Sequence, residues 1–332
     1  MTASNPASGN APTQGPVYLR ALGAHVPAGR ISNARFEELT GNDADWFVAR
    51  TGIHTRSRAA PEDTTSSMAI DAVQTMLDQD PEVLGGVDLI IGASYTPDDT
   101  LSTMAARVQR AFGIEQARVY FISTACTSWI SALELAELMI KSGVATRALV
   151  VVAEHNSRYS DDADRFSGHL WGDGAAATVL TTRPEGALFS LDYIRSRGLA
   201  CEGLGPEAIT LTLDQGEKGL VMSGGRDVFA RACEYLVEEI RDALGQTGHG
   251  IEDMDWLVPH QANHRILVNV ARTLDLPAER VVVTVDTLGN TGCASIPISL
   301  ASVLDQVKRG QVVVGAAFGG GYSAGAVTLT RL

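Results

Sequence analysis

The stretch "VYFISTACTSWISALELAELMIKSG", residues 119–143, decides the fold. It begins as an apolar strand, passes through a loop of small and hydroxyl residues around Cys126, and continues as a helix that ends at Gly143. A second stretch, "VVVTVDTLGNTGCASIPISLASVLDQVKRG" at residues 281–310, repeats this order of features, and both place a glycine 17 residues after the cysteine. An apolar run follows each stretch. The chain therefore reads as a duplicated α/β unit.

Outside the repeat, apolar runs typical of strands alternate with helical patterns over most of the chain, which is the signature of an α/β fold. A length of 332 residues exceeds what one hydrophobic core usually serves. We expect a disordered leader at residues 1–16, an N-terminal half at residues 17–185 and a C-terminal half at residues 186–332. Residues 184–222 break the rhythm, so we expect them to join the halves.

Composition excludes several classes of protein. The net charge of −13 argues against a nucleic-acid-binding protein, because phosphate contacts need a basic face. There is no apolar run of about 18 residues, so we expect no membrane span. The polar N-terminal stretch lacks a signal-peptide pattern, so we expect a cytoplasmic protein. No C-x-x-C pair occurs, so we expect neither a metal site nor a disulfide framework from the four cysteines, Cys126, Cys201, Cys233 and Cys293.

Cys126 lies where the strand-like run meets the predicted helix, beside the good N-cap residues Thr127 and Ser128. Free N–H groups and the positive end of a helix dipole lower the pKa of a thiol and favour the thiolate. We therefore expect a nucleophile here. The alternative is a buried, unreactive cysteine, because free cysteines are among the most buried residues.

Three later features are candidates for the same site. His260, in "DWLVPHQANHRI", follows an apolar strand, and strand ends in α/β sheets face clefts. It suits a general base or a hydrogen-bond donor, with a structural histidine as the alternative. Asn290 lies between glycines, where its amide can donate to an oxygen or hold a turn. The glycines at 319–321 let backbone N–H groups approach a substrate, or mark a tight turn.

The order of these features is more specific than any one of them: Cys126, His260, Asn290, then Gly319 to Gly321. With them the chain resembles the thiolase superfamily, and more closely the β-ketoacyl-acyl carrier protein synthase III family, over residues 17–332. The stretches "DWFVARTGI" (45–53) and "DRFSGHLWGDGAAATVL" (164–180) also carry the resemblance. It implies an α/β, thiolase-like fold of two duplicated halves in a five-layered α-β-α-β-α arrangement.

The resemblance implies an acyltransferase that performs a decarboxylative Claisen condensation. Cys126 would take the acyl group from an acyl-CoA, while the N–H groups of Cys126 and Gly320 hold the oxyanion. His260 and Asn290 would then donate to the thioester carbonyl of malonyl-acyl carrier protein as CO2 leaves, giving a 3-oxoacyl product for fatty acid or polyketide biosynthesis. Family members use no cofactor apart from the coenzyme A thioester substrate, and they are usually homodimers.

Family positions for the nucleotide end of CoA are also matched. Trp46 and Arg165 match the residues that sandwich the adenine, since a flat aromatic ring and a guanidinium suit a purine face. Arg50 matches a position near the same nucleotide, and Asn263 matches a residue that supports the site. The alternative is that Trp46 is a core aromatic and Arg165 a solvated loop charge.

A basic patch for acyl carrier protein is expected on one helix face, because Arg265 and Arg272 lie about two helical turns apart. Arg231 joins them from the preceding helix. Such a patch would suit the acidic helix of the carrier protein. The alternative is an ordinary solvated helix face.

Departures from the family pattern lie where substrate choice is made. Leu101 stands where family members often carry a bulky aromatic that reaches from one subunit into the acyl pocket of its partner, and Trp171 replaces a usual Phe. Arg195 and Arg197 are added in the segment at residues 192–211. One alternative function is therefore a specialised secondary-metabolism homologue with a non-acetyl starter. Another is an acyltransferase that moves the acyl group to oxygen or nitrogen without decarboxylation.

Overall fold

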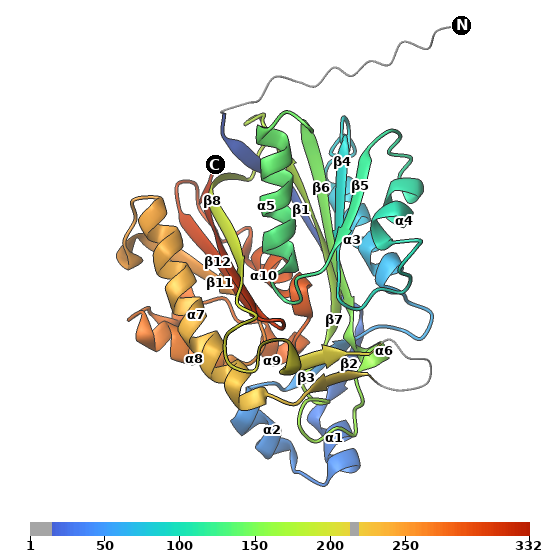
Figure 1. Ribbon diagram of the computed structural model, residues 1–332, viewed down its shortest axis with the longest axis vertical. Helices are drawn as coiled ribbons and strands as arrows, with labels where there is room; N and C mark the ends of the chain where they lie inside the picture. The colour runs from blue at the N-terminus through green and yellow to red at the C-terminus, as the bar shows by residue number, and fades with distance from the viewer. Residues whose placement is uncertain (1–14, 213–218) are drawn as a thin grey trace, which may run out of the picture.

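One mixed β-sheet runs through the molecule in a computed structural model that describes residues 15–212 and 219–332 (Figure 1). The predicted leader, residues 1–16, thus lies almost entirely outside the described residues. Within them the sheet has nine strands, hydrogen-bonded in this order: β11 (Met254–Pro259), β12 (Val312–Gly319), β13 (Ser323–Arg331), β8 (Phe189–Gly198), β1 (Val17–His25), β7 (Asp173–Thr181), β6 (Arg147–His155), β4 (Leu89–Ala93) and β5 (Arg118–Ile122).

The strand order repeats on the two sides of the β1–β8 pairing. On one side β1 is antiparallel to β7, β7 is antiparallel to β6, and β6, β4 and β5 are parallel. On the other side β8 is antiparallel to β13, β13 is antiparallel to β12, and β12 and β11 are parallel. A parallel bridge from Leu257 in β11 to Val281 takes the place of β5. The duplication predicted from the sequence is visible in this topology, while the division at residues 185 and 186 stays a prediction.

Residues 184–222 do more than join the halves, which corrects the expectation. Phe189–Gly198 forms β8, which is hydrogen-bonded to β1 and to β13. The sequence analysis did not predict this strand because Arg195 and Arg197 interrupt its apolar pattern. Both arginines pair with carboxylates of α7 (Gly225–Gln246). Further along the segment, β9 (Ile209–Leu211) and β10 (Leu220–Met222) form a hairpin.

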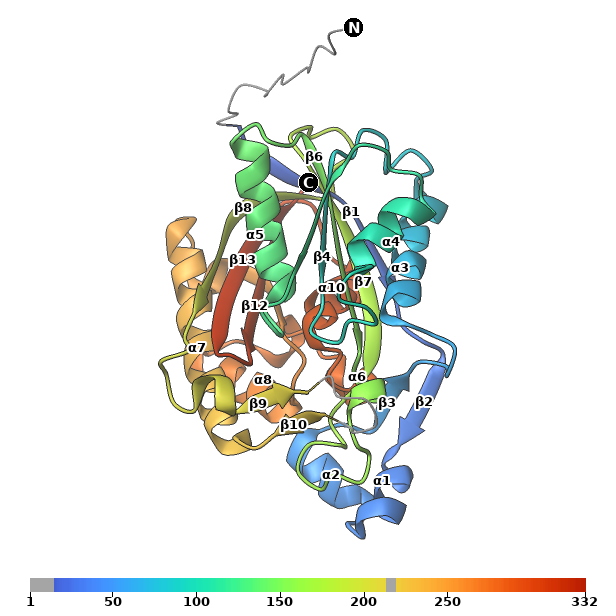
Figure 2. The ribbon, with the colours of Figure 1, turned by 45° about the vertical axis from the view of Figure 1, so that its right-hand side comes forward.

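The two halves of the sheet form two β layers, with helices between them and on both outer faces, which gives five layers (Figures 1 and 2). The middle layer is α5 (Ser128–Lys141) and α10 (Ser295–Val303), whose apolar side chains share one core with strands of both halves. A second core lies beneath α3 (Thr65–Gln79) and α4 (Met104–Ala111), on the outer face of the N-terminal strands. A third lies beneath α7 and α8 (His264–Thr273), on the outer face of the C-terminal strands. These are the layers α-β-α-β-α that the family resemblance implied.

Short elements gather at the end of the molecule near β7 and the β9–β10 hairpin, among them β2, β3, α1, α2 and α6 (Figure 2). No helix of the described residues is long and apolar enough to cross a membrane. The remaining elements are β2 (Gly29–Ser32), α1 (Asn33–Thr40), α2 (Ala44–Thr51), β3 (Thr55–Arg58), α6 (Asn156–Tyr159), η1 (Gly205–Glu207), η2 (Ile251–Asp253), η3 (Ala278–Arg280), α9 (Val285–Leu288) and η4 (Gly292–Ala294).

Candidate active site

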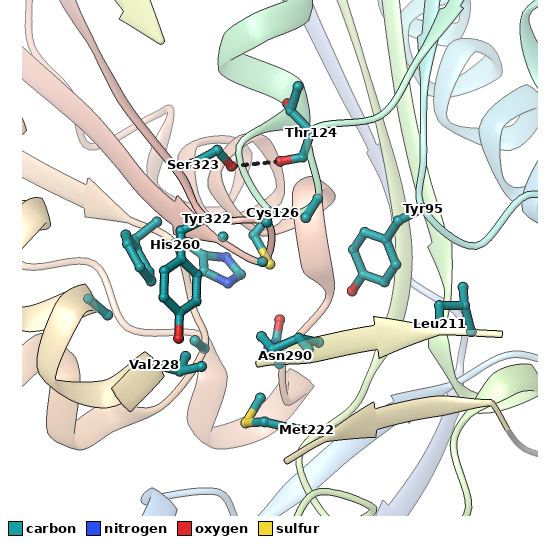
Figure 3. Close-up of a pocket in the computed structure, with 18 of the residues that line it drawn as sticks. Tyr95, Thr124, Cys126, Leu211, Met222, Val228, His260, Asn290, Tyr322 and Ser323 are labelled. Carbon is teal, nitrogen blue, oxygen red and sulfur yellow. Dashed lines mark hydrogen bonds between the residues drawn. The ribbon is translucent and has the colours of Figure 1, made fainter. Parts of the chain in front are cut away.

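A cavity of about 450 Å³ lies where the two halves meet, and Cys126, His260 and Asn290 all line it (Figure 3). Cys126 comes from the N-terminal end of α5, His260 follows β11, and Asn290 lies in the loop between α9 and η4. The turn between β12 and β13 and the β9–β10 hairpin close other sides. The structure therefore brings together three side chains that lie up to 164 positions apart in the sequence.

The hydroxyl residues around Cys126 hold a tight turn. Ala125 has a φ of 51°, a left-handed conformation that few residues with a side chain adopt. The Ser128 hydroxyl donates to the Ala125 carbonyl at 2.7 Å and accepts from the Thr124 N–H at 2.8 Å. Thr127 is the N-cap residue of α5, but its hydroxyl donates to the Thr124 carbonyl and accepts no hydrogen bond from the N–H groups of the first helical turn. These hydroxyls thus fix the turn that presents Cys126 to the cavity.

The glycine turn lies directly against the cysteine. A methyl group at Gly319 would lie 2.8 Å from the Cys126 nitrogen, so only glycine fits this close approach. The backbone N–H groups of Gly320 and of Cys126 itself both face the Cys126 sulfur, and both lower its pKa. Two N–H donors at one reactive atom are the arrangement that holds an oxyanion in acyl transfer.

The resting thiol is nevertheless neutral, which corrects the expectation of a lowered pKa. Burial first, and then the nearby Glu154 carboxylate, raise the pKa of Cys126 to about 12, although the N–H groups of Gly320 and Cys126 lower it in part. The sequence argument considered only the helix end. It omitted the cost of placing a thiolate in a buried cavity wall.

His260 is held as a neutral ring with a defined donor. Burial lowers its pKa to about 4, and its Nδ1 lies 2.7 Å from the Ser295 hydroxyl. That hydroxyl also accepts from the Gln261 N–H at 3.3 Å. This favours Ser295 as the donor to Nδ1, which leaves the hydrogen on Nε2, the other ring nitrogen.

The Asn290 amide is oriented by its own loop. Its Oδ1 accepts from the Gly292 N–H at 2.9 Å, so the two hydrogens of Nδ2 are left for the cavity. Its backbone is fixed on both sides, because the Asn290 N–H donates to the Leu170 carbonyl and the Gly172 N–H donates to the Asn290 carbonyl. A neutral imidazole and a neutral amide thus supply two N–H donors beside the cysteine.

Comparison with known proteins places this site in a family. Residues 121–196 match 3-Oxoacyl-[acyl-carrier-protein (ACP)] synthase III, and residues 244–331 match its C-terminal part. The chain is 37% identical over 320 residues to beta-ketoacyl-[acyl-carrier-protein] synthase III of Allorhizobium ampelinum, covering 94% of this chain and 98% of that protein. The chain belongs to the β-ketoacyl-acyl carrier protein synthase III family.

Other members agree in sequence and in structure. Synthase III 2 of Deinococcus radiodurans is 37% identical, with 94% of both chains covered. The synthase III structure from Thermus thermophilus has a TM-score of 0.88 at 35% identity and covers 95% of this chain and 99% of that one. The priming β-ketosynthase of the R1128 polyketide pathway has a TM-score of 0.84 at 26% identity, covering 97% and 98%. The predicted family, the thiolase-like fold and the assignment as an acyl-transferring condensing enzyme are confirmed.

The residues predicted for the nucleotide end of CoA are only partly brought together. Arg50, not Arg165, lies over the Trp46 ring, with its guanidinium carbon 4.6 Å from the ring centroid. Arg165 is exposed in the turn at residues 165–170. Asn263 is the N-cap residue of α8; it accepts from the Arg265 N–H and reaches the Arg50 carbonyl at 3.4 Å. Asn263 therefore ties α8 to α2 and does not line the cavity.

Of the two acyl-pocket candidates, only Trp171 lines the cavity of its own chain, where it is 2% exposed. Leu101 is 93% exposed and lies away from the described cavity. The added Arg195 and Arg197 are bound to acidic residues of α7 and do not face the cavity, so they supply no cation to an acyl group.

The predicted carrier-protein patch is smaller than expected. Arg265 and Arg272 are exposed on α8, as predicted, and the Arg265 guanidinium lies 5.8 Å from the Phe229 ring centroid. Arg231, however, lies 3.2–3.9 Å from carboxylate oxygens of three acidic neighbours, Glu202, Asp227 and Glu234. Its charge is already matched there, so it does not extend the basic face.

Sequence reasoning missed Glu154, a buried carboxyl behind the cysteine. It accepts hydrogen bonds from the Ser94 and Thr96 hydroxyls, the Tyr95 and Thr96 N–H groups, and the Cys293 thiol. Burial raises the pKa of Glu154 to about 7 despite these donors. The signal in the sequence was an acid at the end of the apolar run "RALVVVAE". Among the described residues no group of three or more His, Cys, Asp or Glu could hold a metal ion.

Proposed function

We propose that this chain condenses an acyl-CoA with malonyl-acyl carrier protein, through an acyl group on Cys126, to give a 3-oxoacyl product and CO2. The observation that carries the proposal is the convergence of Cys126, His260 and Asn290 on one cavity beside the N–H group of Gly320. The names of the relatives are those of synthases III, which favours condensation over the two alternatives.

In the first half-reaction the Cys126 sulfur attacks the thioester carbon of acyl-CoA. The oxygen that becomes negative is held by the N–H groups of Cys126 and Gly320. Because the resting thiol is neutral, its proton leaves as the S–C bond forms, and CoA takes up a proton when it departs as a thiol. The half-reaction therefore consumes and releases no net proton.

In the second half-reaction the bond between C2 of the malonyl group and its carboxylate breaks. CO2 leaves, and the electron pair forms an enolate whose oxygen accepts from His260 Nε2 and Asn290 Nδ2. C2 then attacks the acyl carbon, and the sulfur leaves as a thiolate. The thiolate takes a proton from solvent, so this half-reaction consumes one proton. Two neutral donors stabilise this enolate without trapping it as a protonated enol, and no cofactor takes part.

Partner binding follows from the same residues. We propose that the Trp46–Arg50 pair, with Arg165 on its exposed turn and Asn263 behind Arg50, binds the nucleotide end of CoA. We also propose that Arg265 and Arg272 attract the carrier protein. The edge strand β5 carries the 44% exposed Tyr120, and Leu101 is 93% exposed. An unpaired edge beside exposed apolar side chains suits a homodimer. We further propose a cytoplasmic enzyme.

The test compares the amounts of CoA, CO2 and acylated carrier protein that the enzyme forms. The purified protein is incubated with acyl-CoA and malonyl-acyl carrier protein, and free CoA, CO2 and the mass of the carrier protein are measured together. We expect equal amounts of CoA, CO2 and 3-oxoacyl carrier protein, no product with Cys126→Ala, and unchanged stoichiometry with the exposed control Cys201→Ala. Release of CoA without CO2 would support acyl transfer to oxygen or nitrogen instead.

A further inference from the structure

Tyr95 is a cavity residue that the proposed mechanism does not use. Its side chain points toward the space between Cys126 and Asn290 (Figure 3). A methyl group at Gly292 would lie 2.5 Å from the Tyr95 hydroxyl oxygen and 2.7 Å from Glu154 Cγ. Gly292, with a φ of 58°, thus leaves the space that this hydroxyl occupies, two residues from Asn290. The hydroxyl is therefore built into the wall of the active site.

The protein offers the Tyr95 hydroxyl little to bind. Its oxygen is buried, and among the described residues the Asn156 side chain is within reach of it but makes no well-formed hydrogen bond with it. The nearest carboxylate, Glu154, already accepts from five donors, more than its roughly four lone-pair sites serve well. Asn156 lies beside the hydroxyl, and its Oδ1 is likewise buried without a donor. The Asn156 amide hydrogens are used by the Gly172 and Asn290 carbonyls.

A second residue that lines this cavity has a polar group without a partner among the described residues. Trp171 is 2% exposed, and its indole N–H has no acceptor among the described residues. An indole N–H can only donate. The hairpin wall of the cavity is mostly apolar, because Thr210 is its one hydroxyl-bearing residue and the other lining residues are Ile209, Leu211, Leu220 and Met222. Buried polar groups that lack partners are costly, and in a binding site they are expected to meet a polar group of the ligand.

We infer that the Tyr95 hydroxyl, assisted by the Trp171 indole N–H, selects acyl groups that carry an oxygen a few bonds from the thioester carbon, such as hydroxyacyl or carboxyacyl groups. The inference rests on the proposed function, because it takes this cavity to be the place where Cys126 carries the acyl group. A plain alkyl chain would leave the indole N–H unpaired and the Tyr95 hydroxyl with only its poor contact to Asn156, whereas an oxygen accepts from both groups. Tyr95 acts here on substrate choice and takes no part in bond making.

The experiment measures how fast Cys126 of the purified full-length protein is acylated, by intact mass, with pairs of acyl-CoAs of equal size. One pair is 3-hydroxybutyryl-CoA and 3-methylbutyryl-CoA; the other is succinyl-CoA and 4-methylpentanoyl-CoA. We expect the oxygen-bearing member of at least one pair to react about tenfold faster or more, which corresponds to about 1.4 kcal/mol. Tyr95→Phe should reduce this ratio to near one while the alkyl rate stays measurable.

Tyr322→Phe is the matched control, because Tyr322 lines the same cavity but its hydroxyl already donates to Asp227 at 2.8 Å. This variant should keep the wild-type ratio. Equal or faster acylation by the alkyl member of both pairs would overturn the inference. So would a Tyr95→Phe variant that loses both members equally, since that result indicates a structural role. If no acyl-CoA acylates Cys126 at all, the proposed function fails and this inference fails with it.

Discussion

Replacing Asn290 separates its two hydrogen-bonding roles. The side chain accepts from the Gly292 N–H through Oδ1 and leaves Nδ2 for the cavity. Asn290→Ala removes both interactions. Asn290→Asp keeps an oxygen for Gly292 and nearly the same shape, but it replaces the donor by a second acceptor. The aspartate variant therefore removes the donor while it preserves the turn.

The size of the effect follows from the charge that develops on the enolate oxygen. Loss of one donor to such an oxygen costs about 10²–10³-fold in rate, or about 2.7–4 kcal/mol. Asn290→Asp should lose at least as much, because a carboxylate beside the enolate also repels it. Acylation of Cys126 relies on the N–H groups of Cys126 and Gly320, so it should change by less than about tenfold, or about 1.4 kcal/mol.

The assay measures the two half-reactions apart. Intact mass after mixing with acyl-CoA alone gives the rate of acylation, and CO2 release from malonyl-acyl carrier protein with preacylated enzyme gives the rate of condensation. Near-wild-type CO2 release by Asn290→Asp would show that Asn290 only holds its turn. An equal loss in both half-reactions would contradict the separate roles assigned to the two sets of donors.

Three further predictions follow from burial and close contact. Gly319→Ala should slow acylation at least about 100-fold, since its methyl group would lie 2.8 Å from the Cys126 nitrogen; Gly245→Ala, which meets nothing within 4 Å, is the control and should acylate normally. Between about pH 4.5 and 7.5 the free energy of unfolding of the wild type should fall relative to that of Glu154→Gln by about 3 kcal/mol. The reason is that burial raises the pKa of Glu154 from 4.5 to about 7, so the folded state binds the proton of this carboxyl more tightly than the unfolded state does. This stabilisation is lost as the pH rises through that range. Urea midpoints of the two proteins that run parallel at all pH values would contradict the prediction. Iodoacetamide alkylation of Cys126, followed by peptide mass, should speed up about tenfold per pH unit from about pH 7 to 10 without levelling off, because burial raises the thiol pKa to about 12; a plateau near neutral pH would refute the neutral thiol.

Much of the fold was predictable because its signal is local. The repeat of strand, cysteine loop, helix and glycine predicted α5 and α10, and the apolar runs predicted strands such as β4 and β6. The strand β8 was missed because its arginines are held by α7, an element that begins 27 residues after that strand ends. A pattern of alternating charge predicts a solvated segment when its partners are unknown.

The site was predictable in its membership but not in its electrostatics. The order of Cys126, His260 and Asn290 identified the residues that share the cavity. The direction of the thiol pKa depends on burial and on Glu154, neither of which spacing reveals. Likewise, Arg50 rather than Arg165 lies on the Trp46 ring, and the contact of Tyr95 with Gly292 joins positions 197 residues apart.

The most direct test of the central claim is the mass of the protein after mixing with an acyl-CoA alone, followed by peptide mapping. The account predicts one acyl group per chain, located on Cys126, in the wild type and in Asn290→Asp, and none in Cys126→Ala. An acyl group that persists in Cys126→Ala, or a wild-type protein that remains unmodified by every acyl-CoA offered, would contradict it.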